Sequence, residues 1–197
     1  TSFQFAPEKE KIVFITTGED DGLTAGIYQV DVLSGETTQI IEGEADYSAL
    51  TITKDGTLGA FLADMRDKEE RKDSKEYEVY QWSDLDQAVK VIAKDDSAIP
   101  ENWEISNNSS LSFSNSGQRL FFGIAPIPPE KDTTVLEEEK PVLDIWHWNE
   151  PQLQTVQLKR KGRDARKTLL SVRHLDLNKT VILADQDYSG IRSMNQG

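Results

Sequence analysis

Short segments in which apolar and polar residues alternate occur along most of the chain, and one arrangement of them recurs four times. In each copy an alternating segment leads into a turn and a second apolar segment follows, which is the pattern of a β-hairpin. The first segments end at Phe5, Ile52, Phe113 and His174. The positions four residues later hold Lys9, Gly56, Gly117 and Asn178, so three of the four suit a tight turn. The positions nine residues later hold Phe14, Phe61, Phe122 and Leu183.

Each copy of this hairpin begins a longer unit. A third strand is predicted over residues 26–31, 78–82 and 143–148, and a fourth over 38–41, 89–92 and 153–158. Four antiparallel strands in a repeating unit are typical of the blades of a β-propeller. The sequence therefore predicts an all-β fold, a partial β-propeller of about three and a half four-stranded antiparallel blades. The alternative is a β-sandwich, whose strands follow one another at similar spacing.

The predicted units cover residues 1–46, 47–99 and 100–163, and a partial fourth unit covers 164–197. Closed propellers typically have about four to eight blades, so we expect the chain to be a fragment of a longer protein. An open arc of blades leaves strand edges and apolar faces uncovered at both ends. We therefore expect the fragment to self-associate.

Two strongly charged segments are expected to be loops. The segment 64–77 lacks the apolar stripe of a packed helix. The segment 159–167 is basic, and we expect a solvated loop there; the alternative is a contact with an acidic surface of a larger chain. The basic residues are Lys159, Arg160, Lys161, Arg163, Arg166 and Lys167.

The composition limits the partners and the chemistry. The 197 residues carry a formal net charge of −13, which argues against nucleic acid or an anionic membrane as the main partner. The chain contains no cysteine, so disulfides and zinc–thiolate sites are excluded. No apolar segment approaches the ~18 residues of a membrane span. We expect a folded binding or scaffold unit.

No catalytic residue, metal site or cofactor is predicted. The nucleophile motif Gly-x-Ser-x-Gly is absent, and the two histidines, His147 and His174, lie on predicted strands where a structural role is favoured. The acidic pairs that could suggest calcium lack the spacing of a calcium loop. These pairs are Asp20 with Asp21 and Asp64 with Asp67.

One blade carries a more specific resemblance. The segment Ser114-Asn-Ser-Gly-Gln-Arg-Leu-Phe-Phe122, followed by Leu143-Asp-Ile-Trp-His-Trp148, resembles the repeat of TolB-like and prolyl-oligopeptidase-type propellers. The stretch 111–148 looks like the propeller of large exported bacterial serine peptidases of the dipeptidyl aminopeptidase and acylaminoacyl peptidase types. The chain departs from the usual turn by having Ser116 where aspartate is common and Lys9 in place of the first turn glycine.

This resemblance implies that catalysis and substrate selection belong to two different domains. In such peptidases the catalytic serine, aspartate and histidine lie on a separate α/β-hydrolase domain, and the propeller gates and orients peptide substrates. The chain would then be the non-catalytic propeller of a periplasmic or otherwise exported serine peptidase, with the hydrolase domain and peptides as its partners. The alternative is a TolB-like propeller that binds proteins or ligands and has no peptidase partner.

The connections between second and third strands are the predicted contact loops. They lengthen from unit to unit and should emerge on one face of the propeller, where binding residues usually lie. The third carries Glu137, Glu138 and Glu139. In dipeptidyl-peptidase-type enzymes, paired glutamates from a propeller insertion bind the free amino terminus of the substrate, and a carboxylate pair suits an ammonium group. The alternative is that these glutamates are simply solvated.

Overall fold

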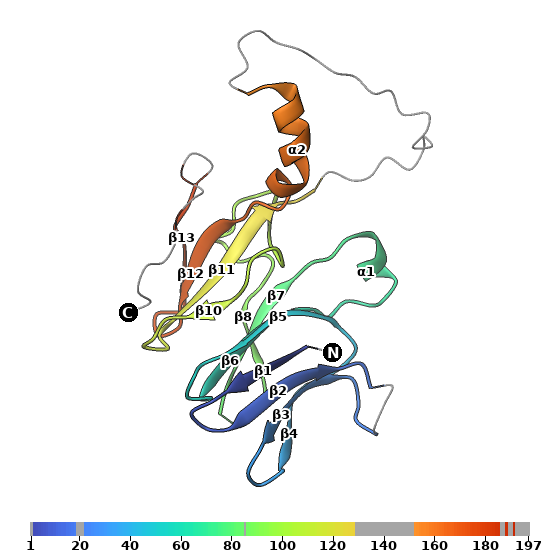
Figure 1. Cartoon of the computed structure of the whole chain (residues 1–197), viewed down its shortest axis with the longest axis vertical. Helices are drawn as coiled ribbons and strands as arrows, with labels where there is room; N and C mark the ends of the chain where they lie inside the picture. The colour runs from blue at the N-terminus through green and yellow to red at the C-terminus, as the bar shows by residue number, and fades with distance from the viewer. Residues whose placement is uncertain are drawn as a thin grey trace.

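Three antiparallel sheets follow one another along the chain in the computed structural model, which describes residues 2–18, 22–84, 86–128, 152–185, 188 and 191 (Figure 1). The first sheet has the strand order β1-β2-β3-β4, and the second has the order β5-β6-β7-β8. The first is formed by β1 (Phe3–Ala6), β2 (Lys11–Thr16), β3 (Gly26–Asp31) and β4 (Thr37–Glu42). The second is formed by β5 (Asp46–Ile52), β6 (Leu58–Asp64), β7 (Glu78–Ser83) and β8 (Val89–Ile92).

The third sheet has the order β10-β11-β12-β13, and a short strand, β9, pairs with the end of β11. These strands are β9 (Trp103–Ile105), β10 (Ser112–Phe113), β11 (Arg119–Pro126), β12 (Leu169–His174) and β13 (Lys179–Ile182). One turn of helix, α1 (Glu70–Asp73), lies between β6 and β7. A longer helix, α2 (Gln154–Asp164), precedes β12.

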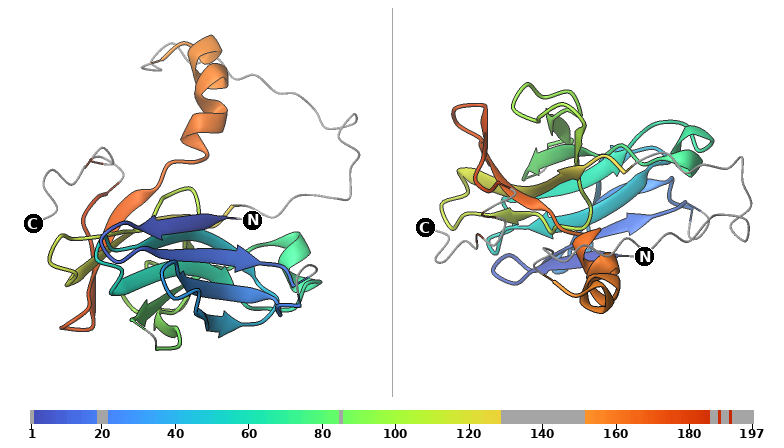
Figure 2. Two further views of the ribbon diagram at one scale, coloured as in Figure 1. Left: turned by 60° about the horizontal axis from the view of Figure 1, so that its bottom comes forward. Right: turned by 90° about the horizontal axis from the view of Figure 1, so that it is seen from above.

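The packing of the sheets is that of a propeller. The first strands of consecutive sheets lie side by side, β1 beside β5 and β5 beside β10. Figure 2 shows the second sheet lying between the first and the third. Two facing sheets of a sandwich do not give this serial arrangement around a common line of inner strands. The predicted fold class, a partial β-propeller with antiparallel four-stranded blades, is therefore confirmed.

The strand β6 takes part in both cores because alternate residues of a strand point to opposite faces. Phe61 and Ala63 lie in the core between the first and second sheets. Ala60 and Leu62 lie in the core between the second and third sheets. The segment thus reads as a nearly continuous apolar run, as expected for a strand that is buried on both sides.

The predicted turns are largely confirmed. Gly56 (φ 67°), Gly117 (φ 70°) and Asn178 (φ 52°) all have the left-handed backbone that the turns require. In the first hairpin Glu10 (φ 51°), rather than Lys9, takes that conformation. The turn therefore tolerates a non-glycine residue at a position one residue later than the repeat predicts.

The division of the last part of the chain is different from the prediction. The strand predicted over 153–158 is wrong, because those residues lead into α2 and form its first turns. Glutamine, leucine, lysine and arginine, which are strong helix formers, make up most of α2. The strands β12 and β13, which the sequence assigned to a partial fourth blade, are the third and fourth strands of the third sheet. The boundary predicted at residues 163 and 164 therefore lies inside the third blade.

The reason for this correction lies in the pairing of β11. Six consecutive residues of β11, from Arg119 to Ile124, pair with the whole of β12, from His174 back to Leu169.

The third strand predicted over 143–148 lies outside the described residues. The loop predicted over 64–77 is confirmed apart from the single turn α1. The basic segment 159–167 lies largely on α2 rather than in a loop, and no residue of that helix is buried.

Candidate functional site

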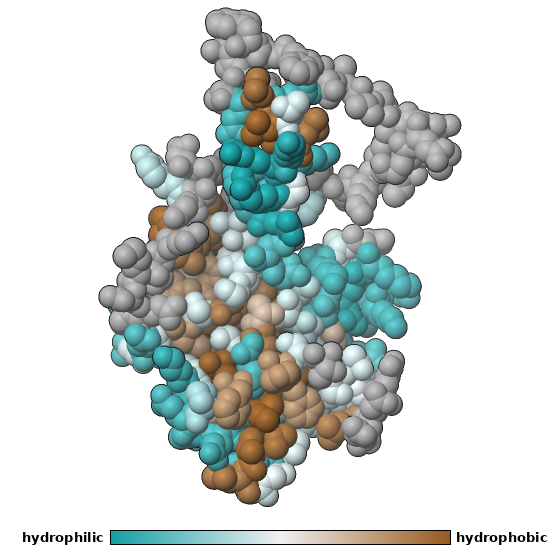
Figure 3. Space-filling view, in the orientation of Figure 1, coloured by the Kyte–Doolittle hydropathy of each residue, from teal (hydrophilic) through white to brown (hydrophobic). Residues whose placement is uncertain are grey.

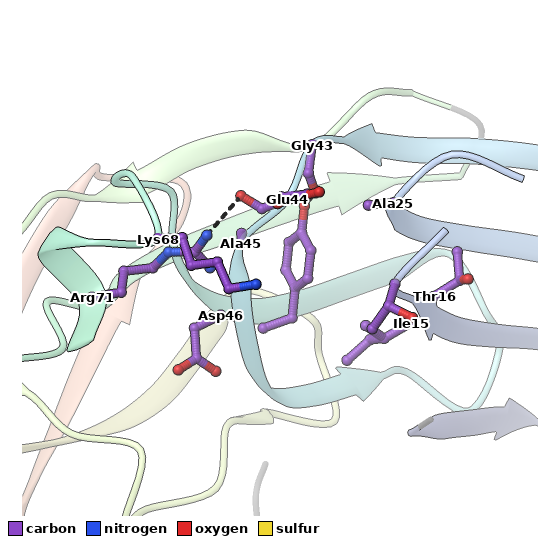
Figure 4. Close-up of a pocket in the computed structure, with 11 residues that line it drawn as sticks. Ile15, Thr16, Ala25, Gly43, Glu44, Ala45, Asp46, Lys68 and Arg71 are labelled. Atoms are coloured by element: carbon purple, nitrogen blue, oxygen red, sulfur yellow. Dashed lines mark hydrogen bonds between the residues drawn. The ribbon is translucent and has the colours of Figure 1, made fainter. Parts of the chain in front are cut away.

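The loops between second and third strands of the first two blades meet at one end of the propeller. The end of β2, the start of β5 and the loop after β6 together line a pocket of about 390 Å³ (Figure 4). The same end of the third blade lies close to this region: Asn107, beside β9, donates a hydrogen bond of 3.2 Å to the hydroxyl of Tyr77. We call this end of the molecule the loop face.

An aromatic ring forms part of the pocket wall. Tyr47 on β5 packs edge-to-face against the buried Phe61, with ring centroids 5.8 Å apart. Its hydroxyl donates a hydrogen bond of 2.8 Å to the carbonyl oxygen of Gly43. Burial raises the pKa of Tyr47 to about 12, with Arg71 acting in the opposite direction. This tyrosine is therefore neutral at physiological pH and offers an apolar surface with a satisfied hydroxyl.

Two cations reach the pocket from the loop after β6. Lys68 is exposed, and Arg71 is half-buried on α1. Arg71 donates one long hydrogen bond, 3.5 Å, from Nη2 to the carbonyl oxygen of Glu44, drawn as a dashed line in Figure 4. Its buried Nε has no hydrogen-bond partner among the described residues. The bond to Glu44 uses one of the guanidinium's five N–H donors, so donors other than the buried Nε are left for a ligand, and carboxylates are the anions that pair best with it.

Two acidic residues, Glu44 and Asp46, line the pocket, and one of them is already paired. Asp46 forms an ion pair with Lys75, and that hydrogen bond is the main cause of a raised pKa of Lys75. Because Asp46 is engaged, a ligand in this pocket meets the two cations, Lys68 and Arg71, and the exposed carboxylate of Glu44. The geometry favours a ligand with an apolar part against Tyr47 and a negative group near the two cations.

A buried carboxylate holds the loop that carries these cations. Asp64, at the end of β6, is 1% exposed. It accepts hydrogen bonds from Arg66 Nε at 2.9 Å and Nη2 at 2.7 Å, and from the backbone N–H of Glu76 at 2.8 Å. Burial acts to raise the pKa of Asp64, but the bonds from Arg66 and Glu76 outweigh it and hold the pKa below its ordinary value. The clamp joins both ends of the loop, so it positions Lys68 and Arg71.

The structure answers only some of the sequence-based expectations about the site. Glu137, Glu138 and Glu139 lie outside the described residues, as do His147, Asp20 and Asp21. His174 ends β12 beside the turn at Asn178, the opposite end of the blade from the loop face. Asp64, considered above as part of a calcium site, is instead paired with Arg66. Across the described segments no three His, Asp or Glu side chains gather as a metal site would require.

The pocket itself was not predicted from the sequence. Lys68 and Arg71 stand in a segment that mixes acidic and basic residues, and such a segment reads as a solvated loop. Only the folded chain brings that loop against Tyr47 and the end of β2, residues that lie 20 or more positions away.

Comparisons with known proteins add little to this picture. No family model matches the chain, and no curated protein matches it. Among solved structures, it is similar to TolB from Acinetobacter baumannii, with 12% sequence identity and a TM-score of 0.47 over 94% of this chain and 32% of that chain. It is also similar to the tricorn protease, with 10% identity and a TM-score of 0.46 over 92% of this chain and 18% of that chain.

The chain thus spans about a third of the TolB chain and about a fifth of the tricorn protease chain. At these TM-scores the likenesses carry no argument of their own, and the propeller fold stands on the order and packing of the three sheets. Neither α1 nor α2 is long and apolar enough to cross a membrane, and no other helix occurs in the described part of the chain.

Proposed function

We propose that this chain is the propeller part of an exported serine peptidase, where it gates and orients peptide substrates for a hydrolase domain that lies outside these 197 residues. The proposal draws on the resemblance of the stretch 111–148 to the propellers of prolyl-oligopeptidase-type enzymes. It also draws on the fold, because a rigid propeller with its long loops on one face suits the presentation of a binding surface.

The loop-face pocket is the observation that carries the proposal. It combines an aromatic wall, Tyr47, with two cations, Lys68 and Arg71, beside the exposed Glu44 and the paired Asp46. A peptide end or an acidic side chain offers the complementary groups, an apolar surface and a carboxylate. Lys68 and Arg71 would hold the carboxylate, and the ring of Tyr47 would contact the neighbouring apolar side chain.

The residues that the structure describes around this pocket do not include the groups that peptide hydrolysis needs. Its described lining residues include the hydroxyls of Thr16 and Thr17 but no histidine that could act as a general base. Recognition without chemistry is therefore the role that its residues support. The hydrolysis itself is assigned to the hydrolase domain.

The test begins with the protein expressed from its complete reading frame. It is treated with a fluorophosphonate probe that labels active serine hydrolases, and the labelled peptide is identified by mass spectrometry. We expect one labelled serine outside residues 1–197, together with hydrolysis of dipeptide amides of proline or alanine. A complete protein that takes no label and hydrolyses none of these amides would overturn the peptidase assignment and favour the TolB-like binding scaffold.

The role of the pocket is tested separately in the same protein. We expect the Lys68→Ala and Arg71→Ala double variant to raise KM for substrates with an acidic residue about 10-fold and to leave kcat unchanged. The matched control is Lys72→Ala, which removes an exposed cation of α1 that pairs with Glu69 and does not line the pocket. If Lys72→Ala raised KM as much as the double variant does, the loss of positive charge in general, and not the loss of the pocket contacts, would explain the weaker binding.

A further inference from the structure

A second pocket, of about 560 Å³, lies where the connection after β8 meets the hairpin of β12 and β13. None of its described lining residues belongs to the loop-face pocket. We call it the hairpin pocket. The polar residues that line it are Asp96, Ser97, Arg173, Asn178, Lys179 and Thr180.

A buried arginine takes part in this lining. Arg173 on β12 is 7% exposed. Its Nη1 donates hydrogen bonds to Asp96 Oδ2 at 3.3 Å and to Thr180 Oγ1 at 2.9 Å, and its Nη2 donates one to Asn178 Oδ1. Its Nε is buried and has no hydrogen-bond partner among the described residues. The contacts within the described chain therefore do not use every N–H donor of this guanidinium.

The acidic residue among the described lining residues already has partners on both of its oxygens. Asp96 Oδ1 accepts a hydrogen bond of 3.0 Å from the backbone N–H of Ala98. Its Oδ2 accepts one from Arg173 and one from the Thr180 hydroxyl, each of 3.3 Å. The ion pair with Arg173 balances one of the two cations that line the pocket, and Lys179 is the other.

The hydrogen-bonding capacity that remains in the hairpin pocket consists mainly of donors. A guanidinium can only donate, so the amide oxygen of Asn178 faces Arg173 and its Nδ2 group keeps two N–H donors. Lys179 is exposed and forms no ion pair with any described residue, so its ammonium group keeps three donors. The hydroxyl of Ser97, which is also exposed, adds another. These groups suit a ligand that carries acceptor atoms and negative charge.

The part of the chain around the hairpin also favours an anion. The whole chain has a formal net charge of −13, but residues 152–185 carry eight basic and three acidic side chains, a balance of +5. Figure 3 shows hydrophilic side chains over the part of α2 nearer the sheets, and α2 holds several of these basic residues. A local excess of positive charge attracts anions, and salt weakens that attraction.

We propose that the hairpin pocket binds a phosphate group carried by a small organic molecule. A phosphate monoester has a charge of about −1.5 to −2 at pH 7 and three strong acceptor oxygens. Lys179, Asn178 and Ser97 supply donors from separate side chains, which suits three oxygens better than the two of a carboxylate. The pocket volume lies within the range of about 300–1,000 Å³ that is usual for small-molecule sites, so the carrier has room beside the phosphate. This inference concerns a different site from the loop-face pocket and does not depend on the proposed function.

Titration of the isotope-labelled chain with glycerol 3-phosphate, followed by two-dimensional amide NMR, tests the proposal. We expect saturable shifts of the backbone amide signals of Ser97, Asn178 and Lys179, with a Kd of about 1 mM at low salt. Inorganic phosphate should bind about 3-fold more weakly, because it lacks the contacts of the carrier. Acetate at the same ionic strength should bind about 10-fold more weakly, because it has less charge and fewer acceptor oxygens.

Three variants locate the binding site. Asn178→Asp keeps a residue type that tolerates the left-handed turn but replaces the amide donors with a carboxylate, so glycerol 3-phosphate should bind about 10-fold more weakly. Lys179→Ala removes the exposed cation and should weaken binding about 5-fold. Lys9→Ala is the matched control, because Lys9 is an exposed lysine at the turn of the first hairpin and does not line the pocket. Circular dichroism checks that every variant is folded.

The outcomes that contradict the proposal are distinct. Amide signals that do not saturate far above the expected Kd, or equal binding by Lys179→Ala and Lys9→Ala, would overturn the site itself. Acetate that binds as tightly as glycerol 3-phosphate would overturn the choice of phosphate. Tighter binding of inorganic phosphate than of glycerol 3-phosphate would overturn the organic carrier and assign the pocket to the free ion.

Discussion

Replacing Leu62 with alanine should strongly destabilise the chain, because this side chain belongs to the contact between the second and third blades. Leu62 is 0% exposed and shares its core with Val79, Phe122 and Ile124. The lost carbon groups account for about 2 kcal/mol at ~0.8 kcal/mol each, and the cavity brings the expected cost to about 3–5 kcal/mol. A domain of this kind is stable by only about 5–15 kcal/mol, so the loss is a large fraction of the total.

The same chemical change at Leu33 is the control. Leu33 is 81% exposed, and Leu33→Ala should alter the free energy of unfolding by no more than about 0.5 kcal/mol. Urea unfolding of both variants and the unmodified chain at one protein concentration measures the difference. In a thermal scan, a 3 kcal/mol loss corresponds to a fall in Tm of about 6–12 °C. A cost below about 1 kcal/mol at Leu62 would refute the stacking of the second and third sheets.

Three further changes test other contacts. Gly59→Ala should destabilise by about 3 kcal/mol or more in urea unfolding, because the added Cβ would lie 2.0 Å from the buried ring of Trp82. Asp64→Asn should cost about 3 kcal/mol at pH 7, since it removes the buried carboxylate that pairs with Arg66 and accepts from the Glu76 N–H, although Arg66 keeps its ion pair with the Glu76 side chain. Because the pKa of Asp64 is lowered in the folded state, the stability that its carboxylate adds is fully present above about pH 4 and is lost as the pH falls through the folded-state pKa. The difference in unfolding free energy between the unmodified chain and Asp64→Asn should therefore shrink on acidification below about pH 4. Glu104→Gln should stabilise by up to about 1 kcal/mol at pH 7, because burial raises the pKa of Glu104 and folding disfavours its charged form. That gain should disappear below about pH 4, where the glutamate is protonated in both states.

The local parts of the fold could be predicted because they depend on neighbouring residues. The alternation of apolar residues and the turn residues Gly56, Gly117 and Asn178 are enough to place the hairpins. The repeat then identifies the blades, because each hairpin begins a unit of the same kind. The aromatic positions Phe14, Phe61 and Phe122 follow from the same spacing.

The third blade could not be predicted because strand pairing there is not local. The partner of β11 is β12, which begins at Leu169, more than 40 residues after β11 ends at Pro126. Leu153 and Val156 suggest a strand by their spacing, but the basic and glutamine residues around them form α2. The loop-face pocket is non-local for the same reason, since Tyr47 and Arg71 lie far apart in the sequence and line one pocket in the folded chain.

Binding of a short peptide to the loop face is the most direct test of the central claim, that this propeller recognises peptides through Lys68 and Arg71. A fluorescent pentapeptide with a free carboxyl terminus and its amidated twin are titrated with the chain, and the fluorescence anisotropy is followed. Charge-assisted hydrogen bonds contribute about 1.5–3 kcal/mol, so we expect the free acid to bind at least 10-fold more tightly than the amide. The Lys68→Ala and Arg71→Ala double variant should abolish that preference, and Lys72→Ala should retain it. Equal binding of the acid and the amide by the unmodified chain would contradict the claim.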